Sequence, residues 1–236
     1  MIFIGDVHGK YNQWRKLTKR LTEEGKHSLQ VGDFGLFRGG NLHKLGKRDP
    51  KMHRFIRGNH DNPSVCKRAS HYLGDFGYDE HTGIFYAGGG YSIDHMHRTI
   101  GRDWWPDEEL TYAQAMAALA LYQEVKPRIV VTHEIHSDAK PWVANSALKI
   151  DYVSCNEAVF QQMWEWEGWK PEYWIFGHYH QKKEFQVKGH RTVHVCLDEM
   201  MRGRPEDIIF EIPGLEWKLP EKKEKDGDQV PPSNAE

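Results

Sequence analysis

Eight side chains in this sequence are able to bind or assist a pair of divalent metal ions, and they come in five short blocks. Each block follows a short apolar run that is typical of a strand. The blocks are Gly5-Asp6-Val7-His8-Gly9, Gly32-Asp33, Gly58-Asn59-His60-Asp61, Thr132-His133 and Gly177-His178-Tyr179-His180. Carboxylate, carbonyl and imidazole donors suit first-row divalent ions. Because two such ions can neutralise both the attacking and the leaving oxygen of a phosphoryl transfer, the five blocks together predict a two-metal phosphoester hydrolase.

Taken singly, each block also has an ordinary structural explanation. Asp6 and His8 are compatible with a capped loop, and Gly32-Asp33 and the Gly58 block are compatible with turns. No cysteine occurs in the blocks, which argues against a closed structural zinc site. The metal interpretation therefore rests on finding all five blocks at strand ends in one chain.

The elements that position these blocks alternate between strands and helices. Trp14, Leu17 and Leu21 have helical spacing and Gly25 is a plausible stop, while Thr111 and Ser154 each begin a capping-box pattern. Antiparallel strands are expected around 184–187, 192–196 and 207–212. In open α/β sheets, ligands bind outside the carboxyl ends of the strands, so we expect the five blocks to meet at one edge of the fold.

Composition indicates an ordinary globular domain. The 236 residues are 39% hydrophobic and 28% charged, and the net charge of -2 gives no support for a nucleic-acid-binding domain. We expect one domain over residues 1–217 and a disordered charged tail over 218–236. Three cysteines without CxxC spacing favour a reducing compartment, and no apolar run approaches the roughly 18 residues of a membrane span, so a cytoplasmic protein is expected.

The blocks together resemble the calcineurin-like metallophosphoesterase superfamily, whose pattern is D-x-H, GD, GNH[D/E], a lone His and GHxH. The resemblance covers about residues 1–212 and implies a four-layer α-β-β-α sandwich with two central mixed β-sheets. It implies that Asp6, His8, Asp33 and His180 hold one ion, and that Asp33, Asn59, His133 and His178 hold the other. A metal-bridging hydroxide would attack phosphorus, His60 would assist the leaving oxygen, and Asp61 would orient His60. Manganese is the expected metal, with iron, zinc or nickel as alternatives.

Departures from the pattern bear on the substrate. Leu36 and Phe37 stand where serine/threonine protein phosphatases carry an acid and a phosphate-binding arginine, which disfavours that branch. The segment from Ser92 to Glu108 is similar to small bacterial and phage-encoded members. Within it, Arg98 is a candidate for binding substrate phosphate and Trp104 for stacking on the substrate, although both have plain structural explanations.

One expected function and two alternatives follow. A phosphodiester or phosphomonoester of small size, such as a nucleotide, is the expected substrate, with diesters slightly favoured. A metal-dependent nuclease is the first alternative, although the chain has no evident basic capping domain. A non-catalytic interaction module on the same fold is the second, and it would be expected to lose ligands that this sequence retains. The oligomeric state is left open, and the additional His136 is expected at the surface.

Overall fold

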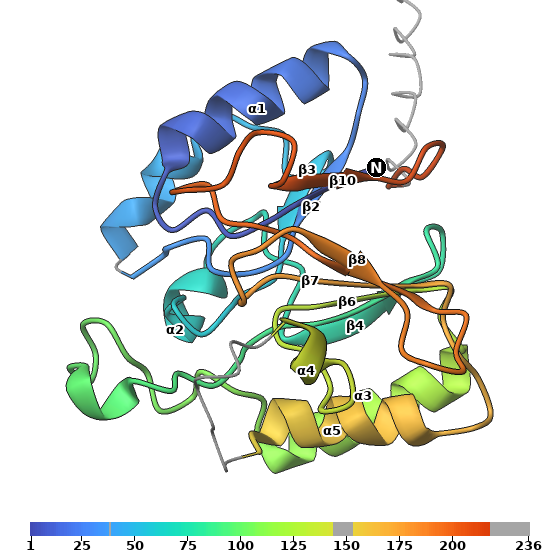
Figure 1. The fold of residues 1–236 in the computed structure, drawn as a ribbon. Coiled ribbons are helices and arrows are strands. Elements are labelled where there is room, and N and C mark those ends of the chain that lie inside the picture. Colours follow the sequence, from blue (N-terminus) through green and yellow to red (C-terminus); the bar gives the residue numbers. More distant parts are fainter. Residues whose placement is uncertain (38, 144–152, 218–236) are drawn as a thin grey trace, which may run out of the picture.

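Two mixed β-sheets lie face to face at the centre of the molecule (Figure 1). The computed structural model describes residues 1–37, 39–143 and 153–217, so the predicted tail 218–236 lies outside the described residues. The first sheet has the order β10-β1-β2-β3, and the second has the order β4-β5-β6-β7-β9-β8. Their strands are β1 (Ile2–Ile4), β2 (Ser28–Gln30), β3 (His53–Phe55), β4 (Phe76–Asp79), β5 (Ile84–Ala87), β6 (Ile129–Thr132), β7 (Tyr173–Phe176), β8 (Lys183–Phe185), β9 (Val193–Cys196) and β10 (Ile209–Glu211).

The direction of pairing brings the predicted blocks to the same edge. Strands β1, β2 and β3 run parallel, as do β5, β6, β7 and β9, whereas β10, β4 and β8 pair antiparallel at the sheet margins. The expected antiparallel pairing after His180 is thus found between β8 and β9, and β9 also pairs parallel with β7. Five loops therefore leave the carboxyl ends of parallel strands side by side.

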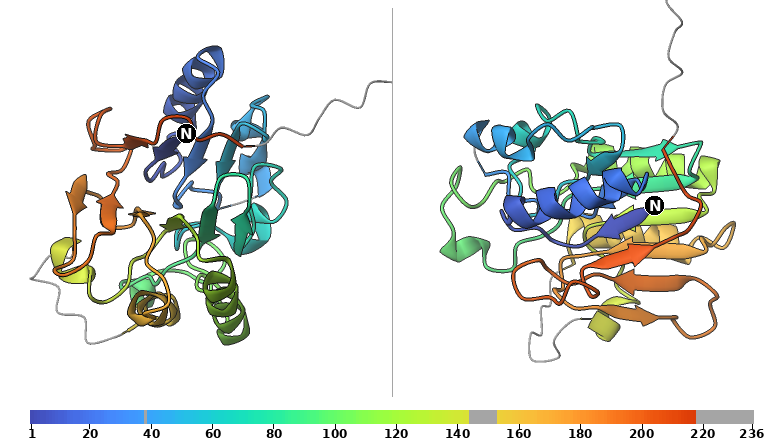
Figure 2. Two further views of the ribbon diagram at one scale, coloured as in Figure 1. Left: turned by 90° about the vertical axis from the view of Figure 1, so that its right-hand side faces the viewer. Right: turned by 90° about the horizontal axis from the view of Figure 1, so that it is seen from above.

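Helices cover the outer faces of both sheets (Figure 2). Helix α1 lies against the first sheet, and α3 and α5 lie against the second, which confirms the predicted four layers. The helices are α1 (Tyr11–Glu23), α2 (Pro63–Cys66), α3 (Tyr112–Val125), α4 (Lys140–Val143) and α5 (Cys155–Glu165), with 3₁₀ turns η1 (Gly39–Leu45) and η2 (His95–His97). In the described part of the chain, no helix has both the length and the apolar character needed to cross a membrane.

Helix starts follow the predicted capping chemistry. The Thr111 side chain accepts the Gln114 backbone N–H, and the Gln114 side chain accepts the Thr111 backbone N–H, which completes a capping box at α3. At α5 the Ser154 hydroxyl accepts the Glu157 backbone N–H, but the Glu157 carboxylate accepts from Ser137 and Lys140, so the predicted capping box is only half formed. These bonds satisfy backbone donors that have no partner inside the helix.

The two-residue period of the strands creates three apolar layers. In β1, Ile2 and Ile4 pack with Trp14 of α1, whereas Phe3 faces the second sheet and packs in the layer that contains Ile129. The outer face of the second sheet packs against α3 and α5. Because the central strands β1, β6 and β7 are covered on both faces, they are almost continuously apolar, whereas β8 at the margin is Lys-Glu-Phe and largely exposed.

One imidazole lies where the sequence does not predict it. His136, expected at the surface, is fully buried, with its Nε2 2.9 Å from Nε2 of His194. The His136 ring stacks on Trp164 with 4.5 Å between centroids. Burial lowers the pKa of both imidazoles, and that of His194 falls to about 4, so this pair is neutral inside the core near neutral pH.

Candidate metal centre

The first cluster consists of the four residues that the resemblance assigns to one ion. Asp6 and His8 follow β1, Asp33 follows β2 and His180 follows β7, and their candidate ligand atoms all lie within 4.8 Å of one another. Nε2 of His8 is 3.0 Å from Nε2 of His180, and Nε2 of His180 is 3.2 Å from Oδ2 of Asp6. Two imidazole nitrogens and two carboxylates thus converge on one point.

The second cluster lies on the other side of Asp33. Oδ1 of Asn59 is 3.0 Å from Nε2 of His133 and 3.1 Å from Nδ1 of His178. Nε2 of His133 is in turn 3.4 Å from Oδ1 of Asp33. The loops after β3, β6 and β7 deliver Asn59, His133 and His178, so the structure brings together all seven predicted ligands.

Buried oxygen atoms indicate that the clusters suit cations. Among the described residues, no hydrogen-bond donor reaches Oδ1 of Asp6 or Oδ2 of Asp33, although both atoms are buried. Buried carboxylate oxygens in folded proteins normally have a donor or a cation as partner. Oxygen and imidazole donors without thiolates match Mn, Fe, Zn or Ni, so these residues fit a pair of divalent ions.

Charge at the centre is held on Asp33. Burial acts to raise the pKa of the Asp33 carboxyl, but His133 and His60 outweigh it and keep that pKa well below its usual range. Burial acts to lower the pKa of His133, and the Asp33 carboxylate instead raises it to about 10. Asp33 is therefore an ionised carboxylate, which is the state that metal binding requires.

The backbone at the ligands is conformationally unusual. His8, Asp33, His178 and His180 have φ values of 44°, 53°, 67° and 50°. Only one other non-glycine residue in the described ranges, Lys126, has a positive φ. Such left-handed conformations cost free energy and persist where the surrounding structure enforces them, often at functional sites.

Gly58 is required for a close approach. A Cβ atom at this position would lie 2.2 Å from Oδ1 of Asp33 and 2.6 Å from Nε2 of His133. Any larger residue would therefore push two ligands apart, which explains why glycine precedes Asn59 in physical terms.

His60 lies at the edge of the two clusters and beside Arg98. Nε2 of His60 is 3.9 Å from Oδ2 of Asp33, and Nη1 and Nη2 of Arg98 lie 3.0 Å and 3.1 Å from the two ring nitrogens. Arg98 is also paired with Asp94 at 2.6 Å. Burial lowers the pKa of His60 and Arg98 lowers it further, against the opposing effect of Asp33.

Asp61 has different partners from those expected. Its Oδ1 accepts the backbone N–H groups of Gly35 and Leu36 at 2.7 Å and 3.0 Å. Its Oδ2 accepts those of Phe34 and Gly58, each at 3.0 Å. The expected bond to His60 is replaced by these four contacts, because the loop after β2 turns back over the carboxylate. Asp61 thus fixes the loop that carries Asp33.

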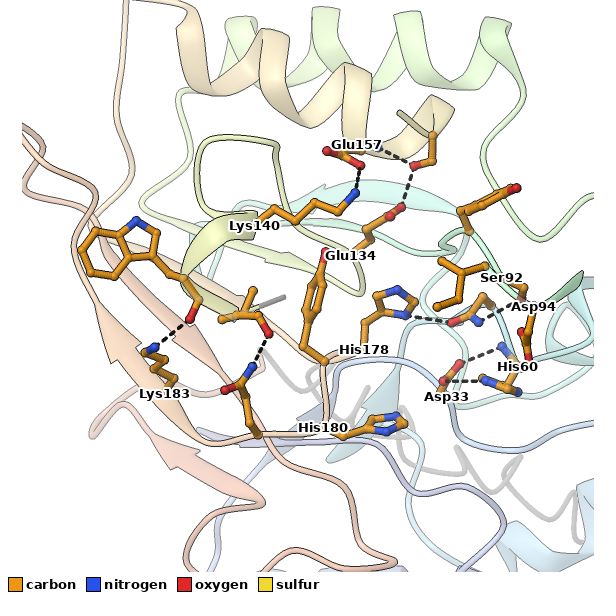
Figure 3. A pocket seen from close by; sticks show the side chains of 18 of the residues that line it. Asp33, His60, Ser92, Asp94, Glu134, Lys140, Glu157, His178, His180 and Lys183 are labelled. Carbon is orange, nitrogen blue, oxygen red and sulfur yellow. Dashed lines mark hydrogen bonds and ion pairs between the residues drawn. The ribbon is translucent and has the colours of Figure 1, made fainter. Parts of the chain in front are cut away.

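A cavity of about 910 Å³ opens beside the clusters, and Asp33, Asn59, His60, His178 and His180 contribute to its wall (Figure 3). Arg98 lines this cavity, as expected of a residue that contacts substrate, whereas Trp104 is not among its lining residues. Trp104 instead packs on His95, with 5.3 Å between ring centroids. The stacking role expected for Trp104 therefore lacks support in the geometry.

Two carboxylates near the clusters have no role predicted from the sequence, although Glu108 ends the segment that resembles small bacterial and phage-encoded members. Glu199 is buried, with Oε2 3.6 Å from Nε2 of His8, and Glu108 lies behind Asn59 through Ser92. Glu199 was detectable in principle, since it follows the end of β9, which runs parallel to β7. Glu108 follows no strand end, so the strand-end rule does not reach it.

The two-sheet sandwich gathers candidate metal ligands at the carboxyl ends of its strands, an arrangement suited to a metal-binding enzyme. The family model described as calcineurin-like phosphoesterase matches residues 1–182. The chain belongs to the calcineurin-like phosphoesterase family, and it is accordingly a metal-dependent phosphoric ester hydrolase.

Solved structures resemble the chain in fold. One is phosphopantetheinyl hydrolase from Mycobacterium tuberculosis, with 13% identity, a TM-score of 0.50, and coverage of 96% of this chain and 98% of that chain. Another is a putative 5'-nucleotidase from Staphylococcus aureus, with 11% identity, a TM-score of 0.47, and coverage of 84% of this chain but 48% of that chain. No curated protein matches the sequence. At these identities the likeness concerns the fold alone.

Proposed function

We propose that the protein hydrolyses a phosphoester with two divalent ions that share Asp33. The observation that supports this most strongly is the position of Asp33 between the clusters. Its Oδ2 is 3.8 Å from Nε2 of His8 on one side, and its Oδ1 is 3.4 Å from Nε2 of His133 on the other. Manganese is the first candidate, and iron, zinc and nickel suit the same donors.

Residues of the chain have distinct roles around the reacting phosphate. When bound, the ion pair polarises the phosphoryl oxygens and supplies the attacking hydroxide. His60 stands beside the clusters and donates a proton to the departing alcohol oxygen. Arg98 holds the His60 ring and presents N–H groups to a phosphate oxygen. Asp61 keeps the Asp33 loop in place through its four backbone contacts.

The shape of the cavity favours a small phosphodiester or nucleotide over a phosphomonoester. From the clusters, the cavity extends toward Lys140 and Lys183, which leaves room for a second substituent on phosphorus (Figure 3). Its wall carries the acids Glu134 and Glu157 beside the bases Arg98, Lys140 and Lys183, and this mixed lining differs from the basic track that a nucleic acid polyanion requires. Retention of every predicted ligand weighs against a non-catalytic module.

The site of action that we propose is the cytoplasm. Cys66, Cys155 and Cys196 are free thiols, and Cys66 and Cys196 are buried. Unpaired cysteines are typical of proteins in reducing compartments.

The experiment is hydrolysis of p-nitrophenyl phosphate and bis-p-nitrophenyl phosphate with added Mn²⁺, Fe²⁺, Zn²⁺ or Ni²⁺. We expect metal-dependent turnover, with the higher kcat/KM on the diester, and loss of turnover in Asp33→Asn. Equal inertness of the wild-type protein and Asp33→Asn with all four ions would refute the proposal. Cleavage of single- or double-stranded DNA or RNA at a higher kcat/KM would favour the nuclease alternative.

A further inference from the structure

A buried hydroxyl–carboxylate pair lies behind the Asn59 amide. Nδ2 of Asn59 donates to Oγ of Ser92 at 3.0 Å, and that hydroxyl donates to Oε2 of Glu108 at 2.6 Å. The Ser92 backbone N–H donates to Oε1 of Glu108 at 2.8 Å. The exposed fractions of Asn59, Ser92 and Glu108 are 2%, 1% and 3%, so water does not compete for these bonds.

We propose that Glu108 and Ser92 are positioning residues that set the orientation of the Asn59 amide and so the affinity of the second cluster for its ion. The inference rests on the proposed two-metal function. It extends that function to two residues that neither the strand-end blocks nor the ligand clusters contain.

Glu108 fixes the direction in which the hydrogen bonds from Asn59 to Ser92 and from Ser92 to Glu108 are donated. An ionised carboxylate only accepts hydrogen bonds, so Glu108 requires the Ser92 hydroxyl to donate its one proton toward it. The Ser92 oxygen is then left with lone pairs alone, and it accepts from the Asn59 NH₂ group and, at 3.3 Å, from Nη1 of Arg98. The reversed amide would place a carbonyl oxygen against those lone pairs, which is repulsive.

The opposite side of the amide faces the second cluster. With the NH₂ group held by Ser92, Oδ1 of Asn59 points toward Nε2 of His133 and Nδ1 of His178, at 3.0 Å and 3.1 Å. A carbonyl oxygen binds a cation, whereas an NH₂ group does not. Glu108 is therefore linked to the second cluster across two hydrogen bonds, whereas the path from Ser92 toward the first cluster is longer and passes through Arg98 and His60.

Glu108 also supports the backbone nearby, which sets the design of the test. Its main-chain oxygen accepts the Gly90 N–H at 3.3 Å and a bond from the Arg57 guanidinium. Substitution of the Glu108 side chain leaves these two bonds in place, since they use the main chain. Measuring the affinity for each ion together with Tm distinguishes a residue that orients Asn59 from one that only supports the fold.

The experiment titrates metal-free, full-length protein with Mn²⁺ by equilibrium dialysis at about pH 8. Burial raises the pKa of Glu108, and the alkaline buffer and the two Ser92 hydrogen bonds favour its ionised form. The variants are Ser92→Ala and the isosteric Glu108→Gln, whose NH₂ group reverses the polarity at Ser92. We expect the second Mn²⁺ to bind roughly 10- to 100-fold more weakly in both, with the first Mn²⁺ bound at wild-type affinity and a lower Tm from the lost hydrogen bond to a buried carboxylate. The matched control is Ser137→Ala, which removes another Ser–Glu bond of 2.8 Å, to Glu157, and is expected to bind both ions normally.

Three results would overturn the inference. Wild-type affinity for the second ion in both variants would show that Asn59 needs no such support. Equal weakening of both ions, or a lowered Tm without selective loss, would assign the pair to packing. A wild-type protein that binds fewer than two Mn²⁺ would refute the proposed function as well, and it is recognised in the wild-type titration before any variant is compared.

Discussion

The four backbone hydrogen bonds of Asp61 predict a large loss of stability in Asp61→Asn. Each carboxylate oxygen accepts two N–H groups, from Gly35 and Leu36 at Oδ1 and from Phe34 and Gly58 at Oδ2. An asparagine retains one oxygen and places NH₂ against the other two donors. Two hydrogen bonds to a charged group are lost, at about 1.5–3 kcal/mol each, which gives roughly 3–6 kcal/mol.

The assay is urea unfolding of the metal-free protein, followed by circular dichroism. Because small domains unfold with about 5–15 kcal/mol, a loss of this size moves the midpoint far toward low urea. The control is Asp49→Asn, since Asp49 is exposed and accepts one backbone bond, from Lys51 at 2.8 Å, and it is expected to cost less than about 1 kcal/mol.

The same variant separates the two roles considered for Asp61. A residue that fixes the Asp33 loop changes the free energy of unfolding. A residue that acts only by orienting His60 lowers kcat without a large effect on unfolding. If Asp61→Asn lost less than about 1 kcal/mol and showed the kinetic defect of a His60 variant, the assignment of Asp61 to the loop would be wrong.

Three further predictions follow from the geometry. Gly58→Ala is expected to abolish tight Mn²⁺ binding, because the added Cβ would lie 2.2 Å from Oδ1 of Asp33. The control Gly189→Ala has open space around the new Cβ and is expected to bind Mn²⁺ normally, so tight binding by Gly58→Ala would contradict the prediction. His60→Asn is expected to lower kcat about 10²- to 10⁴-fold with both ions bound. The loss should be larger for phenyl than for p-nitrophenyl esters, because phenolate is the poorer leaving group and depends more on a proton donor. An equal loss for the two esters would exclude proton donation by His60. For His194, burial lowers the pKa to about 4, so the native state resists protonation and stability falls as pH drops from about 6.5 to 4. Relative to His194→Gln, wild type loses about 3 kcal/mol of unfolding free energy over that window, and parallel pH profiles would refute the assignment.

The ligands of both clusters were predictable because strand ends of parallel sheets converge. The rule needs only the apolar runs and the residues that follow them, and it brings Asp6, Asp33, Asn59, His133 and His178 together without knowledge of the turns. The four layers were expected from the family resemblance and not from the apolar runs, because strands such as β2 and β3 carry polar residues. The family model then matches the same region.

The contacts that orient those ligands were not predictable, because they depend on how loops fold back. Asp61 adjoins His60 in sequence, yet its carboxylate is directed to the loop after β2. Glu108 reaches Asn59 across 49 positions through Ser92, and no spacing rule covers such a bond. Trp104 adjoins a predicted loop, but its ring packs on His95 and not in the cavity.

The central claim is that hydrolysis needs two ions that share Asp33. The most direct test measures turnover of bis-p-nitrophenyl phosphate against the number of Mn²⁺ ions bound per chain, with bound metal determined in the same samples. We expect turnover near background until more than one ion is bound per chain, and a plateau at two. Full turnover at one bound ion per chain, or none at two, would contradict the two-metal account.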